Sequence, residues 1–316
     1  MSGANGRARG RLDGSCAAIL MYHRVLSRDE AERKTVEPGM YVSPETFGRH
    51  ISLLNDLFTV LPLWEIVSRI RDAKPLPPGA CAITFDDGWR DNLENALPVL
   101  RAHEIPATVF VVTDRVGTTG SFWPDEVSRR LSGLERPDRQ EVAAGLGLKD
   151  SDGSIHAILT YMKLISEAER PGLIDRIRRH SVDPFEGDRE LLDWAELSHL
   201  AQHGFDVEAH GVSHAILTES TEEEARNELS FALRTLRDRG HGQHGLFAYP
   251  SGGVDKEVAG FAGDAGYSGA VTTQTGLARS SGDPLMLPRI GLHEDISSTE
   301  LEFLRWVPGS DSFGGR

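Results

Sequence analysis

Two adjacent carboxylates before a glycine are the residues of this chain best suited to chemistry. Asp86 and Asp87 end the apolar, partly β-branched run 80–85 and stand directly before Gly88. Such a run predicts a buried parallel strand that the glycine ends. Inside a regular strand neighbouring side chains point to opposite faces, but at a broken strand end both carboxylates can reach one metal ion. The segment therefore indicates a metal-dependent hydrolytic site; the alternative is an Asx turn with a helix N-cap.

Two histidines four residues apart could supply the remaining metal-binding groups. His210 and His214 follow a second strand-like run, residues 204–209. At this spacing two imidazoles lie on one side of a helical turn. Together with one carboxylate they would make the three-ligand set of a catalytic zinc site, which leaves a position open for water.

The same spacing occurs a second time. His199 and His203 are also four apart, and with twelve histidines in the chain the spacing alone is weak evidence. These two lie within an amphipathic helix expected to begin after Asp193 and to end at Gly204. We therefore expect them on the solvent face of that helix and not at a metal.

Several segments, in this order and spacing, resemble motifs of the polysaccharide deacetylases, carbohydrate esterase family four. The resemblance spans about residues 17–293. It implies a distorted (β/α)7-type barrel with a helical insertion, and an enzyme that hydrolyses N-acetyl groups from an N-acetylated amino sugar in a glycan or glycoconjugate. Three of the segments are FDDG at 85–88, the Asp193-Trp194 helix leading into EAHGVSH at 208–214, and FAYPSG at 247–252. Two more, MYHRV at 21–25 and LPRI at 287–290, resemble the bacterial branch that includes exopolysaccharide (poly-N-acetylglucosamine) deacetylases.

The resemblance implies roles for the acidic and histidine residues. Asp87, His210 and His214 would hold a divalent cation, taken here as Zn²⁺ with Co²⁺ or Ni²⁺ as alternatives. Asp86 would be the general base that takes the proton of the attacking water. No organic cofactor site is expected.

The oxyanion site and the partner of the base are the next roles. By resemblance, the backbone N–H of Ser251 would stabilise the oxyanion. The family's usual motif has an arginine just before its Pro-Tyr-Gly, whereas this chain has Ala248 and Tyr249 before Pro250. The guanidinium that orients the base must then come from elsewhere or be absent, and Arg289 is our candidate.

Two histidines compete for the role of general acid. His23 follows the first expected strand, at a position that resembles the acid-bearing motif of the exopolysaccharide deacetylases. His293 follows the last expected strand, where other family members place theirs. In a barrel the first and last strands adjoin, so both could approach the metal. We favour His23; the alternative for each is a histidine that satisfies a buried backbone carbonyl.

Composition and charge restrict the partners. The net charge of −14 argues against nucleic acid or an anionic membrane as the main partner. No stretch reaches the ~18 apolar residues of a transmembrane helix, and no signal-peptide core precedes residue 21, so a cytoplasmic location is expected. The expected partner is an N-acetylated glycan or sugar conjugate. Nothing in the sequence indicates the oligomeric state.

Alternating strand-like and helix-like segments must position these residues. This alternation is typical of a parallel sheet or barrel with outer helices. We expect a barrel domain over 15–308, a helical insertion at about 114–192, and disordered ends at 1–14 and 309–316. The expected strands are 17–22, 80–85, 107–112, 205–209, 245–249, 268–273 and 287–292. The expected helices of the barrel include 91–103, 193–203, 221–239, 255–265 and 298–306, with a further one opening at Ser43-Pro44.

Two rival functions stay open at this point. One is a metal-dependent amidohydrolase of the same architecture that acts on a small non-sugar amide. The other is a catalytically impaired glycan-binding homologue, which the missing motif arginine favours and the intact acidic and histidine residues disfavour.

Overall fold

The chain forms two compact units. The computed structural model describes residues 12–148, 153–165, 169–183, 185 and 188–307. The first unit, here the barrel unit, contains the chain up to Ser27, Gly39–Thr118 and the chain from Leu191 onward. The second, here the helical unit, contains Arg28–Pro38 and Thr119–Glu190.

Seven parallel strands close into a barrel, which confirms the predicted fold class. The barrel closes because β1 pairs with β5 on one side, from Ala18–Cys81 to Tyr22–Phe85, and with β11 on the other. The short strands β4 (Thr59–Val60) and β10 (Ala278–Arg279) add to its edges. The barrel strands are β1 (Cys16–Tyr22), β5 (Ala80–Phe85), β6 (Ala107–Val111), β7 (Phe205–Ala209), β8 (Leu246–Ala248), β9 (Gly269–Thr275) and β11 (Leu287–Gly291).

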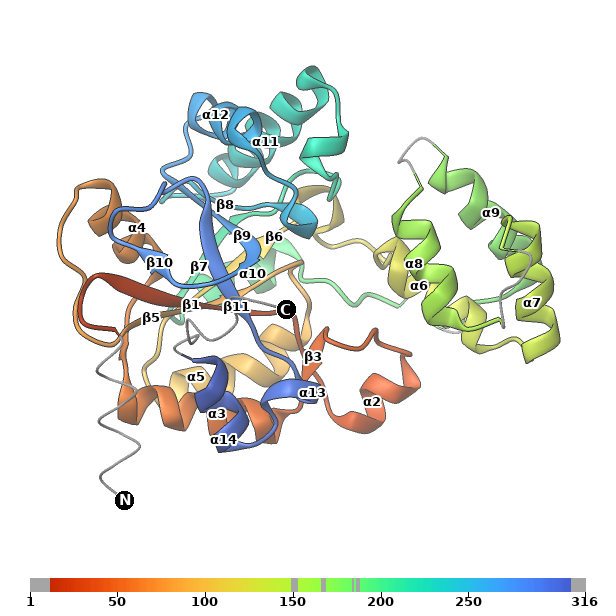
Figure 1. The fold of residues 1–316 in the computed structure, drawn as a ribbon, viewed down its shortest axis with the longest axis horizontal. Helices are drawn as coiled ribbons and strands as arrows, with labels where there is room; N and C mark the ends of the chain where they lie inside the picture. Colours follow the sequence, from red (N-terminus) through yellow and green to blue (C-terminus); the bar gives the residue numbers. More distant parts are fainter. Residues whose placement is uncertain (1–11, 149–152, 166–168, 184, 186–187, 308–316) are drawn as a thin grey trace. The chain divides into compact units, whose positions relative to one another are not determined.

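Most residues of the barrel strands are buried, and amphipathic helices cover the barrel. Every residue of β5 and β6 is buried, as expected of strands enclosed by helices. The helices begin where their caps predict: Ser43 caps α3, and Thr221 forms a capping box with Glu224 at the start of α11. Helix α3 packs beside α5 and α14, and α11 packs beside α12 (Figure 1). The helices of the barrel unit are α3 (Pro44–Leu57), α4 (Leu63–Arg71), α5 (Leu97–Ala102), α10 (Trp194–Ala201), α11 (Glu222–Asp238), α12 (Lys256–Ala265), α13 (Glu294–Ser297) and α14 (Glu300–Trp306).

The structure corrects several sequence predictions in the barrel unit. The helix expected over 91–103 is a π-helical turn, Asn92–Ala96, followed by α5. Helix α4 was not predicted, although its buried residues 63, 66, 67 and 70 have helical spacing. Residues 12–14 were expected to be disordered, but Leu12 is fully buried and its carbonyl accepts a hydrogen bond from Gly79 N–H. The rest of the two expected disordered ends, 1–11 and 309–316, lies outside the described residues.

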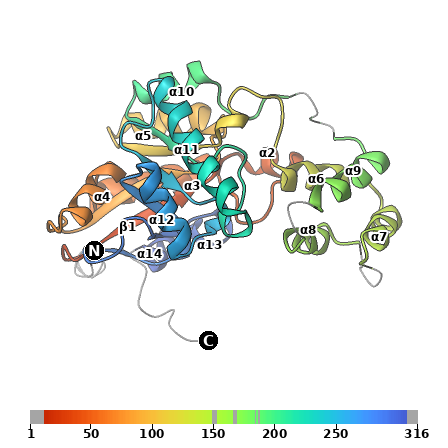
Figure 2. The same ribbon diagram turned by 90° about the horizontal axis from the view of Figure 1, so that it is seen from above.

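The helical unit has its own hydrophobic core, in which Val127, Ile158 and Ile177 are fully buried. Its main helices gather as one group in both ribbon views (Figures 1 and 2). The predicted insertion is incomplete, because residues 28–38 from much earlier in the chain also belong to this unit. The unit's helices are α2 (Arg28–Arg33), α6 (Trp123–Ser132), α7 (Arg136–Gly145), α8 (Ile155–Lys163) and α9 (Arg170–His180).

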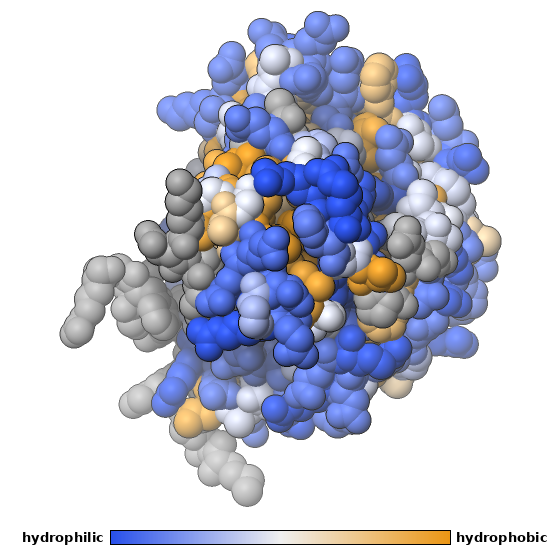
Figure 3. All heavy atoms as spheres, turned by 90° about the vertical axis from the view of Figure 1, so that its right-hand side faces the viewer, coloured by the Kyte–Doolittle hydropathy of each residue, from blue (hydrophilic) through white to orange (hydrophobic). Residues whose placement is uncertain are grey.

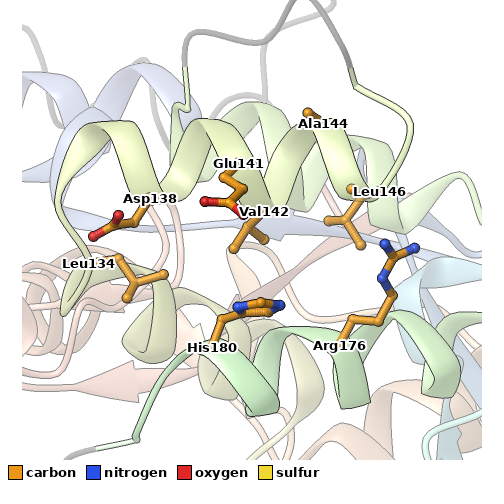
Figure 4. A pocket seen from close by; sticks show the side chains of 9 residues that line it. Leu134, Asp138, Glu141, Val142, Ala144, Leu146, Arg176 and His180 are labelled. Carbon is orange, nitrogen blue, oxygen red and sulfur yellow. The ribbon is translucent and has the colours of Figure 1, made fainter.

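A cavity of about 470 Å³ opens between α7 and α9 in the helical unit. Figure 4 shows carboxylates of α7 on one wall and basic side chains of α9 on the other. All four of these charged side chains, Asp138, Glu141, Arg176 and His180, are exposed, and the floor is apolar. The cavity is therefore an open groove with solvated charges.

A buried ion-pair network joins the ends of the helical unit. Arg129 of α6 donates to both carboxylate oxygens of Asp183, and its Nη1 donates to Glu190 at 3.0 Å. Glu190 also pairs with Lys34 at 2.7 Å, which ties residues 28–38 to the later helices. Arg129, Asp183 and Glu190 are each less than 10 % exposed. Such a network stabilises a fold only while every charge keeps its partner.

One face of the molecule is seen in a space-filling view (Figure 3). On the face shown in Figure 3, hydrophilic residues predominate and hydrophobic ones form small patches. Among the residues that the structure describes, no helix combines the length and the apolar character needed to cross a membrane.

The first prediction concerns the network of Arg129. Arg129→Met should destabilise the helical unit by about 3–5 kcal/mol, because it leaves the buried carboxylate of Asp183 without its cation and removes one of the two cations that pair with Glu190. Hydrogen exchange followed by mass spectrometry would measure the local opening free energy of α6 and α9. Arg178→Met is the matched control: its bonds to Glu126 are half exposed, so its loss should cost under about 1 kcal/mol. Equal effects of the two variants would contradict the assignment.

Candidate active site

The candidate site lies where β5 and β7 end. Asp86 N–H still donates to Tyr22 O, so the ladder between β1 and β5 continues through Asp86. At Asp87 the backbone turns sharply, with φ of 77° at both Asp87 and Gly88. This turn ends the strand alternation, and the two neighbouring carboxylates acquire different partners.

Three side chains converge on one point. Asp87, His210 and His214 each offer a ligand atom, and these atoms lie within 4.8 Å of one another. Asp87 Oδ1 is 3.4 Å from Nε2 of both histidines. It is the only such group among the residues described, and it is the set that the sequence predicted. Two imidazoles and one carboxylate suit a divalent transition-metal ion and leave a coordination position open.

Outer hydrogen bonds orient these three groups. Trp89 Nε1 donates to Asp87 Oδ2 at 3.0 Å, which leaves Oδ1 facing the histidines. His210 Nδ1 lies 2.7 Å from the Ala248 carbonyl oxygen. Because a carbonyl only accepts, Nδ1 carries a proton, and Nε2, which faces Asp87, is the nitrogen that would bind a metal after losing its own proton. The donor set and its supports therefore fit a metal ion.

The pKa values in this cluster reflect the same arrangement. Burial opposes ionisation of Asp87, but hydrogen bonds from His210 and His214 outweigh it and hold the pKa of Asp87 well below its usual value. Burial also disfavours the charged form of His210, yet its contact with Asp87 raises the pKa of His210. The carboxylate of Asp87 is thus ready to bind a cation, and a metal would take the place of the imidazole protons.

Asp86 has a different partner. Arg289 Nη1 and Nη2 donate to Asp86 Oδ1 at 2.7 Å and Oδ2 at 2.6 Å, which makes a bidentate ion pair. Both side chains are buried. Arg289 also donates to Thr84 Oγ1 and to Thr272 O, so its remaining contacts hold the guanidinium in place. Burial raises the pKa of Asp86, but the Arg289 charge and hydrogen bonds outweigh it and lower that pKa overall.

The two candidate acids lie in different surroundings. His23 is half-buried at the end of β1, where burial lowers its pKa and the charges of Asp87 and Asp86 act in the opposite direction. His293 begins α13 and its Nδ1 is 3.2 Å from Asp295 Oδ2. The charge of His23 is among the main influences that lower the pKa values of Asp86 and Asp87. The charge of His293 is not among them.

Ser251 lies in a tight 3₁₀ turn, Pro250–Gly252, that follows β8. Its φ of 53° is in the left-handed region, which a serine seldom adopts. The turn is close to the loop that carries His210 and His214, because His210 contacts Ala248 O just before it.

The second histidine pair lies outside the cluster, as predicted. His199 is exposed on α10, and His203 Nδ1 donates to the carbonyl of His199. Sequence reasoning missed two supports of the cluster. They are Trp89, which donates to Asp87, and Glu228 of α11, which contacts the loop between His210 and His214.

Comparison with known proteins shows the family. The family model described as polysaccharide deacetylase matches residues 73–270, more than half of the chain. The chain belongs to the polysaccharide deacetylase family. Membership supports hydrolysis of N-acetyl groups on sugars in glycans.

Similar proteins agree with this membership. The protein named "Putative polysaccharide deacetylase YxkH", from Bacillus subtilis strain 168, is 22 % identical over 283 residues, which cover 89 % of this chain and 73 % of YxkH. Among solved structures, the Streptococcus pyogenes deacetylase PplD, in complex with acetate, has a TM-score of 0.62 at 20 % identity and is matched over 92 % of this chain and 98 % of its own. IcaB from Ammonifex degensii has a TM-score of 0.61 at 16 % identity, covering 93 % and 97 %. At these identities the structural matches establish the fold.

The second prediction follows from the Asp86–Arg289 pair. Arg289→Met should raise the pKa of Asp86, because burial then acts without the cation that outweighs it. Carboxyl ¹³C NMR titration of aspartate-labelled protein would measure this pKa. Arg289→Lys keeps a charge and should give a smaller rise, while Arg279→Met, at an exposed residue of β10, should give none. An unchanged Asp86 pKa in Arg289→Met would show that the ion pair does not control that carboxylate.

Proposed function

We propose that this protein is a metal-dependent N-deacetylase that removes acetyl groups from an N-acetylated amino sugar in a glycan or glycoconjugate. The observation that carries the proposal is the convergence of Asp87, His210 and His214 beside the buried Asp86–Arg289 pair. A metal-ligand set next to an ionised, oriented carboxylate is what hydrolysis of an amide requires.

Asp87, His210 and His214 would hold the ion, Zn²⁺ by preference and Co²⁺ or Ni²⁺ as alternatives. When bound there, the ion supplies Lewis acidity, which activates water and polarises the acetyl carbonyl. Asp86 accepts the proton of the attacking water. Its lowered pKa keeps it ionised at neutral pH, and the two Arg289 bonds leave a lone pair on each oxygen for the incoming proton.

His23 is the proposed general acid. It must donate a proton to the leaving amine nitrogen, on the side of the scissile amide away from Asp86. Burial lowers the pKa of His23 overall, and the negative charges of Asp87 and Asp86 offset part of this effect in favour of the protonated imidazole that the role needs. The position of His23 at the end of β1, next to β5 in the closed barrel, supports this choice.

The N–H of Ser251 is the proposed donor to the developing oxyanion. The tight turn at Ser251, with its left-handed φ, would preorganise this N–H for that role. Arg289 takes the role of the arginine that the usual motif places before the proline. This pairing weakens the rival hypothesis of an impaired homologue, since the base keeps a guanidinium partner.

The experiment that tests the proposal measures acetate release. Metal-free protein and protein loaded with Zn²⁺, Co²⁺ or Ni²⁺ would be incubated with N-acetylglucosamine oligomers of increasing length and with a small N-acetyl amide that lacks a sugar. We expect metal-dependent release from the sugars. His214→Ala should lose bound metal and activity, whereas Asp86→Asn should keep metal and lose at least ~100-fold in kcat.

Three results would contradict parts of this proposal. Loss of metal in Asp86→Asn would reverse the roles of the two aspartates. Release from the small amide alone would favour a non-sugar amidohydrolase. Full activity of stringently metal-free protein would remove the metal from the mechanism. His199→Ala is the matched control for His214→Ala, since that exposed histidine has the same spacing to its neighbour and should not matter.

The choice between the two acids gives a further prediction. His23→Ala should lower kcat by about 10²–10⁴-fold and remove the basic limb of its pH profile, because no group then protonates the leaving amine. Metal content, measured by atomic absorption, should not change. His293→Ala should lose much less activity. A retained basic limb in His23→Ala together with its loss in His293→Ala would transfer the role to His293.

A further inference from the structure

Glu228, on the helix after the two histidines, contacts the loop that joins them. This carboxylate accepts a hydrogen bond from Val212 N–H at 2.7 Å. It also accepts from Ser213 N–H, at 3.0 Å to the nearer oxygen, and from Ser213 Oγ at 2.7 Å. One side chain of α11 therefore receives three hydrogen bonds from two consecutive residues of a three-residue loop.

The carbonyl side of the same loop is held by the 3₁₀ turn Thr113–Arg115, which follows β6. Thr113 N–H donates to Gly211 O at 3.1 Å, and Asp114 N–H donates to Val212 O at 3.0 Å. Backbone amides thus bind the loop's carbonyls, while a carboxylate binds its amides. Glu228 is thus the group that accepts hydrogen bonds from the backbone amides of Val212 and Ser213.

The loop needs such external support because its own conformation is unfavourable. Gly211 has a φ of 85°, which glycine adopts freely, but His214 has a φ of 73°, which a histidine adopts only where its surroundings impose it. A β-carbon at residue 211 would lie 2.8 Å from Glu228 Oε2, so the carboxylate packs directly against the glycine. Local backbone preference would otherwise return His214 to negative φ and move its ring.

The two histidine ligands depend on this support to different degrees. His210 is buried, its backbone N–H donates to Val111 O, and its Nδ1 donates to Ala248 O. The side chain of His214 is 25 % exposed, against 3 % for His210, and it follows the loop that Glu228 binds. A change in the loop would therefore displace His214 first.

We propose that Glu228 is a positioning residue for the metal site: by binding Val212 and Ser213 it fixes the backbone at His214 and so the place of that ligand's Nε2. The inference rests on the proposed metal-dependent function. It assigns to Glu228 no contact with substrate and no proton transfer. The negative charge is not what matters, because the bonds that carry the role are those to two backbone amides and one hydroxyl.

The test compares three variants of the full-length protein. Glu228→Ala removes every bond to the loop. Glu228→Gln keeps an oxygen that accepts from both amides and an NH₂ that can donate to Ser213 Oγ. Glu223→Ala, an exposed glutamate on the same helix, is the matched control for helix propensity and charge. Zn²⁺ affinity would be measured by chelator competition, and the visible absorption of the Co²⁺-loaded protein would report the ligand geometry.

We expect Glu228→Ala to weaken Zn²⁺ binding by about 10–100-fold, the usual effect of losing a group that orients a ligand, and to alter the Co²⁺ spectrum. Glu228→Gln should restore most of both, and Glu223→Ala should match the original protein. In the metal-free state, amide exchange of the peptide that contains Val212 and Ser213 should be faster in Glu228→Ala. This measurement needs no metal. It also applies to a destabilised variant, because the exchange of the loop peptide can be compared with that of the other peptides of the same variant.

Several outcomes overturn the inference. Unchanged exchange at Val212 and Ser213 in Glu228→Ala would show that the carboxylate does not hold the loop. Unchanged Zn²⁺ affinity and Co²⁺ spectrum would show that the loop does not govern His214. A Glu228→Gln variant as impaired as Glu228→Ala would replace positioning with a charge effect. If the original protein itself binds no metal, the proposed function fails with the inference; if it binds metal and Glu228→Ala binds equally, only the inference fails.

Discussion

The buried ion pair between Asp86 and Arg289 is the interaction on which the site and the inside of the barrel both depend. Two charges taken out of water are tolerated only if each is fully paired and hydrogen-bonded. Here the guanidinium binds both carboxylate oxygens, Thr84 Oγ1 and Thr272 O, and so joins β5, β9 and β11 inside the barrel. The ion pair that connects these strands inside the barrel is therefore the same contact that holds the proposed base, Asp86, in one orientation.

The turn at Asp87 gives two adjacent aspartates different electrostatic surroundings. Asp86 is paired with the fixed guanidinium of Arg289. Separating the two would leave a buried charge without a partner. Asp87 faces two imidazoles that could bind a metal ion together with it, while Trp89 holds its second oxygen. Neighbouring groups whose environments differ in this way can take different tasks in one reaction. The two aspartates of FDDG thus differ: Asp86 is paired with a fixed guanidinium, and Asp87 lies with two imidazoles in a set that could bind a cation.

Local sequence patterns predicted most of the fold and much of the candidate site. The apolar runs of β5 and β7, the broken strand end at Asp87 and the paired histidines can be read within short windows, and Arg289 followed from asking which cation could replace a missing one. Glu228 could not be found in this way, because in sequence it is one of several acidic residues on a helix whose outer face is solvated. Its contact with residues 212–213 depends on how α11 packs. The same holds for residues 28–38, whose place in the helical unit is fixed by a pairing of Lys34 with Glu190 across more than a hundred residues.

The replacement of the motif arginine follows from barrel geometry. In a closed parallel barrel, side chains from several strands converge inside, so a cation can reach a given carboxylate from more than one strand. In this chain residue 248 is an alanine whose carbonyl binds His210, and the guanidinium comes from β11 instead. Arg289 is also hydrogen-bonded to Thr272 O and to Thr84 Oγ1. These bonds keep its guanidinium in place. The carboxylate of Asp86 is consequently held in one orientation by a guanidinium that is itself held in place, next in sequence to the carboxylate that meets His210 and His214.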